Sequence, residues 1–205
     1  MPVTMRFKYK KTDELKYIAH LDTLRVFTRA IRRAKLPVAY SQGFNPHPLI
    51  AFMMPLSLGF TSNCEYVDIG FESIPEGLSA MLDNALPDGF VITECYEPQD
   101  GPVDITACTY SVLFENPIDT AEIKRFFEAD ELIVDKKSKK GIKQVDIMPM
   151  ILGYNISERE IIMTLSAGTV SNLNPELVLK HMPLNEENTY SVCREKILCG
   201  EREFR

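Results

Sequence analysis

The stretch Ser41-Gln-Gly-Phe-Asn-Pro-His-Pro48 lies between a basic helical pattern and an apolar run, and neither pattern continues through it. Its two prolines fix φ and remove backbone donors, so it can form neither a helix nor a central strand. We therefore expect a loop of restricted conformation. Because the loop carries an asparagine and a histidine next to a basic segment, it is more typical of binding or chemistry than of a simple connection.

Around this loop, residues 5–96 read as β-α-β-β-α-β. Residues 5–10 alternate apolar and basic side chains, the period of a half-buried strand. From Leu21 to Ala34 apolar side chains recur at helical spacing, and Pro37 ends that helix. The remaining elements expected here are strands at 38–40, 64–71 and 90–96, and a helix over about 77–86. Residues 49–58 are apolar but interrupted by Pro55, which favours an irregular strand or a covering loop.

A second β-α-β-β-α-β order follows residues 97–102, Glu-Pro-Gln-Asp-Gly-Pro, which are the best linker candidate. We expect strands at 105–114, 160–166 and 190–198, a helix at 119–129, and a hairpin of 132–136 with 142–148. A further helix is expected to start with Asn174 as N-cap and Pro175 at the first helical position. This order is ferredoxin-like. The sequence therefore predicts an α+β protein of two tandem ferredoxin-like halves, 1–97 and 103–205, the second with an extra hairpin.

Length and composition favour a folded protein outside the membrane. The chain has 205 residues, of which 45% are hydrophobic, enough for a core and one or two domains. No apolar run approaches the ~20 residues of a membrane span, and residues 1–6 lack a signal-peptide apolar region. The five cysteines form no C-x-x-C pair, which favours reduced thiols. We expect a cytoplasmic protein with no membrane partner.

Positive charge is concentrated near the N-terminus of an acidic chain. The net charge is -6, yet residues 1–50 hold ten Lys or Arg against three Asp or Glu, a balance of +7. The remainder of the chain therefore sums to -13. Such an asymmetry favours an anionic partner; a solvated helix face is the alternative.

Arginines of the predicted helix, with loop residues after them, form a candidate surface for single-stranded RNA. Guanidinium groups bind phosphates bidentately, and aromatic rings stack on unpaired bases. The candidate substrate-binding residues are Arg25, Arg29, Arg32, Arg33, Tyr40, Ser41, Gly43, Phe44, Asn45 and His47. For Tyr40 and Phe44 the alternative is a place in the core.

His47 is the main candidate for catalysis, and His20, just before the basic helix, could face the same cleft. Histidine in water titrates near neutral pH, which suits an acid, a base or a phosphate contact. The alternative is structural, with His20 capping the helix and His47 bonded to the loop backbone. Together with Cys64 and Asp68 the pair would reach the four ligands of a zinc site only by spatial accident. The sequence therefore predicts no metal site and no cofactor.

A second basic cluster falls on the expected hairpin. Lysine on exposed strands usually protects against aggregation, and contact with RNA is the alternative. The cluster consists of Lys136, Lys137, Lys139, Lys140 and Lys143.

Several motifs agree with one known family. In the first half they are residues 17–22 (Tyr-Ile-Ala-His-Leu-Asp), 29–38, 40–48 and 56–59 (Leu-Ser-Leu-Gly), with Ser62, Glu65 and Asp68; in the second half they are residues 139–141 with Val145 and Asp146. On these residues the chain resembles the radical SAM-linked, or radical SAM-associated, protein family, a domain of unknown function. Ala19 departs from the pattern, since the family usually has Ser there.

The resemblance implies a protein encoded beside, or fused behind, a radical SAM protein that often carries a cobalamin-binding domain. It implies no settled activity. Because the chain lacks C-x-x-x-C-x-x-C, we expect it to hold no iron–sulfur cluster itself. The expected function is that of an accessory protein that recognises RNA, or an RNA-associated substrate, for a partner radical SAM enzyme. A metal-independent RNA-processing enzyme using His47 and His20, or a protein-only scaffold, are the alternatives.

Overall fold

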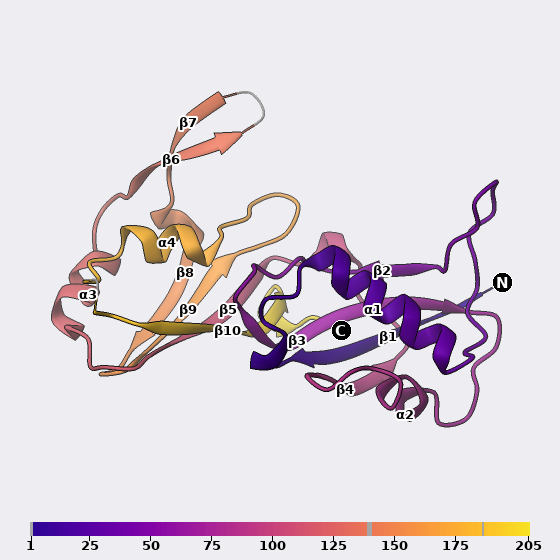
Figure 1. The fold of residues 1–205 in the computed structure, drawn as a ribbon. Coiled ribbons are helices and arrows are strands. Elements are labelled where there is room, and N and C mark those ends of the chain that lie inside the picture. The colour runs from indigo at the N-terminus through magenta and orange to yellow at the C-terminus, as the bar shows by residue number, and fades with distance from the viewer. Residues whose placement is uncertain (1, 139–140, 186) are drawn as a thin grey trace. The chain divides into compact units, whose positions relative to one another are not determined.

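The computed structural model describes residues 2–138, 141–185 and 187–205 and divides into two compact units (Figure 1). Unit 1 comprises Met1–Pro102 with Arg205, and unit 2 comprises Val103–Phe204. Each unit combines antiparallel strands with helices, so the predicted α+β class is confirmed. None of the helices within these described ranges is long and apolar enough to cross a membrane.

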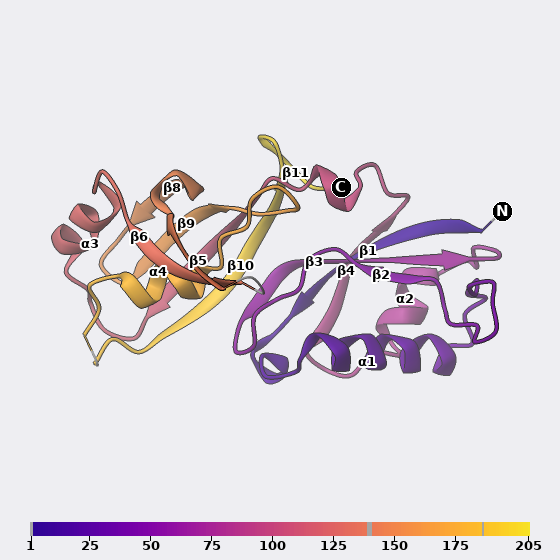
Figure 2. The same ribbon diagram turned by 90° about the horizontal axis from the view of Figure 1, so that it is seen from above.

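Unit 1 is a small antiparallel sheet covered by two helices. Its elements in chain order are β1 (Val3–Lys11), α1 (His20–Arg33), β2 (Ile50–Phe52), β3 (Thr61–Phe71), α2 (Leu78–Asp83) and β4 (Phe90–Tyr96). The strand β1 lies between β4 and β3, and β2 pairs with β3. Both helices lie on the same face of this sheet (Figure 2). The segment between α1 and β2 lies at one end of this unit (Figure 1).

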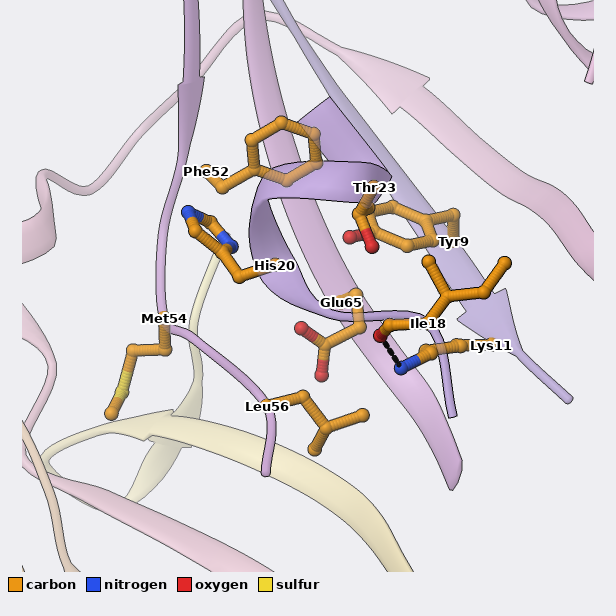
Figure 3. A pocket seen from close by; sticks show the side chains of 9 residues that line it. All are labelled: Tyr9, Lys11, Ile18, His20, Thr23, Phe52, Met54, Leu56 and Glu65. Carbon is orange, nitrogen blue, oxygen red and sulfur yellow. Dashed lines mark hydrogen bonds between the residues drawn. The ribbon is translucent and has the colours of Figure 1, made fainter. Parts of the chain in front are cut away.

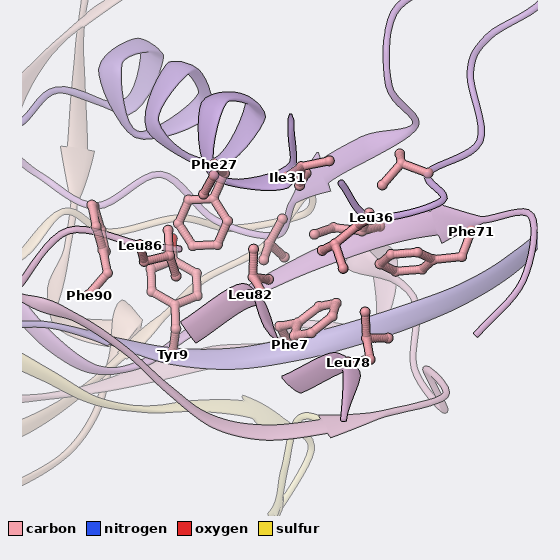
Figure 4. Packing of buried hydrophobic residues seen from close by; sticks show 14 residues of the cluster. Phe7, Tyr9, Phe27, Ile31, Leu36, Phe71, Leu78, Leu82, Leu86 and Phe90 are labelled. Carbon is pink, nitrogen blue, oxygen red and sulfur yellow. The ribbon is translucent and has the colours of Figure 1, made fainter. Parts of the chain in front are cut away.

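The core of unit 1 follows the periodicities read from the sequence. Phe7 and Tyr9 alternate along β1 toward the helices, while Phe27 and Ile31 come from the inner face of α1 (Figure 4). Leu82 of α2 completes the same cluster. Because these helix positions lie three to four residues apart, they occupy one face, and the opposite face of α1 is left to solvent.

Two elements predicted for unit 1 differ in the structure. Residues 38–40 form no strand, only isolated bridges of Val38 with Phe71 and of Tyr40 with Pro48, and the second strand is β2 instead. Pro37 precedes this segment and Pro48 is the bridge partner of Tyr40, and neither proline can donate a ladder hydrogen bond. Helix α2 ends at Asp83, short of residue 86, because the chain tightens into a turn before a proline.

Unit 2 also combines an antiparallel sheet with helices. Its elements are β5 (Ala107–Phe114), α3 (Thr120–Phe127), β6 (Ile133–Ser138), β7 (Gly141–Asp146), β8 (Ile151–Ile156), β9 (Glu160–Ser166), α4 (Pro175–His181), β10 (Tyr190–Cys199) and β11 (Arg202–Glu203). The sheet order is β10-β5-β9-β8, with β11 on β10. Among the described residues, the strands β6 and β7 pair only with each other, as the predicted hairpin (Figure 1).

Helix starts in unit 2 were predictable, whereas one strand was not. Asn174 caps α4 by accepting the backbone N–H of Glu176, and Pro175 takes the first helical position, as predicted. The strand β8 was missed. Its register shifts between Ile151 and Gly153, so its apolar residues do not alternate cleanly.

Candidate functional site

The basic surface of unit 1 is the outer face of α1. Thr23 and Phe27 are buried on the inner face, and Arg25, Arg29 and Arg32 are exposed on the opposite one. At 3.6 residues per turn these three arginines fall in a single stripe. The sequence periodicity therefore placed them together correctly on one rigid element.

The four predicted arginines differ in their contacts. Arg25 pairs with Asp22 one turn earlier, its Nη1 lying 2.7 Å from Oδ1. Arg33 lies at the edge of the face and donates from Nη2 to the carbonyl oxygen of Ala85. Neither Arg29 nor Arg32 makes an ion pair with any residue of the described ranges. Two guanidinium groups are thus open to an anionic ligand.

The loop of residues 41–48 is closed at its base and open at its tip. Tyr40 bridges to Pro48, and the N–H of Ser41 donates to the carbonyl of His47 at 2.9 Å. Beyond this base the loop extends away from the sheet of unit 1 (Figure 1). Phe44 at its tip is 101% exposed, so the alternative that this ring belongs to the core is wrong. Tyr40 at the base is 42% exposed.

His47 is held to the loop by Ser41. The Ser41 Oγ lies 2.9 Å from Nδ1 of the His47 ring and accepts the backbone N–H of the same residue at 3.1 Å. Nδ1 also lies 3.4 Å from the carbonyl oxygen of Asn45. A hydroxyl beside an imidazole is also the arrangement of nucleophilic catalysis. Here, however, the hydroxyl ties ring to backbone, and no described acidic side chain is bonded to the ring.

His20 belongs to a different place, a small pocket at the start of α1 (Figure 3). It is the first helical residue, and the residue at the N-cap position is Ala19, so His20 does not act as the cap. Its ring meets Phe52 edge-on at 5.5 Å between centroids. The cavity holds about 20 Å³, room for about one water molecule.

Two buried charges also line the His20 pocket, and the sequence reading missed both. Lys11 is 4% exposed and its Nζ donates to the carbonyl of Ile18 at 2.9 Å. Glu65, also 4% exposed, turns its carboxylate into the pocket (Figure 3). The sequence did contain a signal for the buried lysine. Lys11 follows Phe7 and Tyr9 at the two-residue spacing of side chains that point to the buried face of β1. A charge at an inward position marks a buried polar site.

The structure does not bring His20 and His47 together. His20 packs on Phe52 at the far end of β2, while His47 lies before that strand begins. The residues that line the pocket of His20 do not include His47. A cleft shared by both imidazoles is therefore not assembled in unit 1.

The remaining candidates are engaged elsewhere or fall outside the description. Asp68 accepts two hydrogen bonds from Arg6, both at 2.7 Å, and Cys64 is buried. Within the described ranges no group of three or more His, Cys, Asp or Glu side chains is placed to hold a metal ion. Lys143 is exposed. The structure describes no side chain for Lys136 and Lys137, and Lys139 and Lys140 lie outside the described residues.

One comparison with known proteins gives a match. Residues 4–175 match a family described as an uncharacterized protein conserved in bacteria, DUF2344. The match spans both units and includes the arginine stripe and the loop. Its description names no activity, ligand or partner. No curated protein matches the chain.

Proposed function

We propose that this chain, which belongs to the DUF2344 family, is an accessory protein that recognises RNA for a partner enzyme. The observation that carries the proposal is the exposed stripe of Arg25, Arg29 and Arg32 on α1. Two of these guanidinium groups make no ion pair within the described residues. Fixed on one helix, they are positioned to bind phosphates of a strand laid along it.

The partner we propose is a radical SAM protein, with or without a cobalamin-binding domain. This part of the proposal rests on the resemblance of residues 17–22, 29–38 and 40–48. In this division of labour the partner supplies the chemistry and the chain supplies recognition of RNA or of an RNA-associated substrate. The chain and the partner, purified separately, are expected to co-elute, and the chain alone, treated anaerobically with iron and sulfide, to show no iron–sulfur absorbance.

We also assign both units to the ferredoxin-like fold, with domain limits near 1–97 and 103–205. The order β1-α1-β2-β3-α2-β4 and the strand order β4-β1-β3-β2 support this for unit 1. For unit 2 the support is the order β10-β5-β9-β8, with the hairpin β6–β7 as the insertion.

The test of RNA recognition is the salt dependence of binding to a single-stranded RNA. Three phosphate contacts are expected to give a slope of about -2 in log affinity against log salt, at about -0.7 per phosphate. The double variant Arg29→Gln with Arg32→Gln should flatten that slope to about a third. The matched control is Arg125→Gln with Lys180→Gln, which removes the same charge from exposed positions of α3 and α4.

Three outcomes separate the proposal from its alternatives. Wild-type protein that binds no RNA at low salt, or a control pair that weakens binding as much as the arginine pair, contradicts the arginine stripe as an RNA site. Absence of RNA binding with retained association to the radical SAM protein identifies a protein-only scaffold. RNA cleavage that disappears in both His47→Ala and His20→Ala identifies a processing enzyme.

A further inference from the structure

We propose that the loop of residues 41–48 is a protein-docking element, which inserts the ring of Phe44 into an apolar pocket of a partner protein. The proposal rests on the proposed function for the identity of that partner. It assigns the arginine stripe and the loop to different macromolecules, RNA for the stripe and protein for the loop.

The first observation is the absence of charge around the loop. From Leu36 to Cys64 the chain contains no Lys, Arg, Asp or Glu over 29 residues, although charged residues make up 25% of the whole. A stretch of this length with the average composition would hold roughly seven of them. An RNA-binding loop needs cations for the phosphates, whereas the centre of a protein interface is depleted of charge and enriched in aromatic rings.

The second observation is the display of Phe44. Its side chain is 101% exposed at the tip of a segment that extends away from its own unit (Figure 1). Tyr40 and Leu49, at 42% and 37% exposure, add apolar surface at the loop base. Burying a phenylalanine side chain in a partner is worth roughly 10- to 150-fold in affinity. Phe44 thus has the properties of an anchor that fills a pocket.

The third observation is that the loop is formed before any partner arrives. Gly43 has φ +149°, a conformation that side-chain-bearing residues rarely adopt, although no neighbouring atom would obstruct a Cβ there. Conformation, and not lack of space, therefore requires glycine at this position. Pro46 and Pro48 restrict the other side of the tip, and Ser41 ties His47 across the base. Such pre-organisation lowers the entropic cost of binding.

The experiment measures two affinities of the full chain, one for the radical SAM protein proposed as its partner and one for single-stranded RNA. Phe44→Ala is expected to weaken protein binding at least 20-fold and to leave RNA affinity within twofold. Val170→Ala, which removes a side chain that is 100% exposed in unit 2, is the matched control and should change neither affinity. The pair Arg29→Gln with Arg32→Gln should show the opposite pattern to Phe44→Ala.

Each other result decides against part of the scheme. Loss of RNA affinity in Phe44→Ala would show that the ring stacks on bases and would overturn the docking proposal. If wild-type protein does not bind the radical SAM protein, the proposed partner fails, and a benzophenone amino acid at position 44 of the full chain then tests docking in cells. The crosslinked protein, once purified, must bind wild type and lose that binding with Phe44→Ala. No protein adduct, or indifference to that substitution, overturns the docking proposal itself.

Discussion

At the scale of single residues, His47 shapes its loop without supporting the core. Its ring and its backbone N–H both meet the hydroxyl of Ser41, and the pair is exposed. Exposed hydrogen bonds exchange with water, so each contributes only about 0.5–1.5 kcal/mol. The effect of these bonds is therefore local and concerns the conformation in which Phe44 is presented.

His47→Ala is accordingly expected to lower the free energy of unfolding by less than ~1 kcal/mol, measured by urea denaturation. Amide hydrogen exchange at Ser41, whose N–H donates to the carbonyl of residue 47, should accelerate at least tenfold, because the loop base loses the bond between the ring and the Ser41 hydroxyl. Ser41→Ala should accelerate this exchange at least as much, because it removes the bond to the backbone N–H of residue 47 as well as the bond to the ring. A loss of stability above ~2 kcal/mol would mean that His47 supports the fold itself.

Cys95 on β4 makes stability depend on alkaline pH. Partial burial raises the pKa of its thiol from 9.0 to about 11. The folded protein thus favours the neutral thiol, so its contribution is complete below pH 9 and is lost as pH rises toward 11. Between pH 8 and 10.5 the free energy of unfolding should fall more for wild type than for Cys95→Ser. Parallel pH profiles of the two proteins would show that Cys95 makes no such contribution.

At the scale of elements, β1 and β3 are joined by a buried ion pair as well as by their ladder. Arg6 and Asp68 are register partners, and two hydrogen bonds of 2.7 Å link the guanidinium to the carboxylate. The side chains are 1% and 16% exposed. Replacing Asp68 takes away the carboxylate to which this buried guanidinium donates twice, and breaking a buried ion pair from one side is strongly destabilising.

Asp68→Asn is therefore expected to cost about 3–5 kcal/mol of unfolding free energy. The matched control is Asp22→Asn, which breaks the exposed pair with Arg25 and should cost less than ~1 kcal/mol. Both losses are measured by urea denaturation, and the slope of the unfolding free energy against urea concentration is compared between the variants. Equal losses in the two variants would contradict a special role for the buried pair.

At the scale of the whole molecule, the C-terminal residue fixes the middle of the predicted linker by hydrogen bonds. Asp100 is buried, and its carboxylate accepts the backbone N–H of Arg205 at 2.8 Å. The carbonyl of Arg205 in turn accepts the N–H groups of Gln99 and Asp100, and its guanidinium lies 5.2 Å from the ring centre of Tyr96. A proline- and glycine-containing stretch is therefore fixed by contacts that lie far from it in sequence.

Asp100→Ala should loosen this stretch. Loss of the carboxylate removes the bond to the backbone N–H of Arg205, so amide hydrogen exchange at Gln99, whose N–H donates to the carbonyl of Arg205, is expected to accelerate several-fold. Exchange at Glu122, whose N–H donates to the carboxylate of Asp119 at the start of α3, serves as the internal control and should not change. Equal exchange at Gln99 in the variant and in wild type would show that the bond to Arg205 does not order the segment.

The local sequence pattern alone was enough to predict those elements whose apolar residues recur at a regular spacing or whose first residues carry a capping signal. The alternation of residues 5–10 predicted β1, and the spacing of Phe27 and Ile31 predicted both α1 and the outward direction of its arginines. Asn174 with Pro175 predicted the start of α4. These signals succeed because a strand or helix with one buried face imposes its own period on the sequence.

Features that depend on a partner distant in sequence were decided only by the tertiary structure. The apolar residues 49–58 are compatible with an irregular strand and with a covering loop, and the pairing of β2 with β3 decided for a strand at 50–52, while residues 38–40 form only isolated bridges. The pocket of Lys11, Glu65 and His20 joins three separate segments, and so the sequence could not reveal that His20 lies apart from His47. The sequence also left open whether Phe44 is exposed. An aromatic ring in a segment with glycine and proline is compatible with a place in the core and with a place at a loop tip. Burial is a property of the packed chain, and hydrophobicity alone does not determine it.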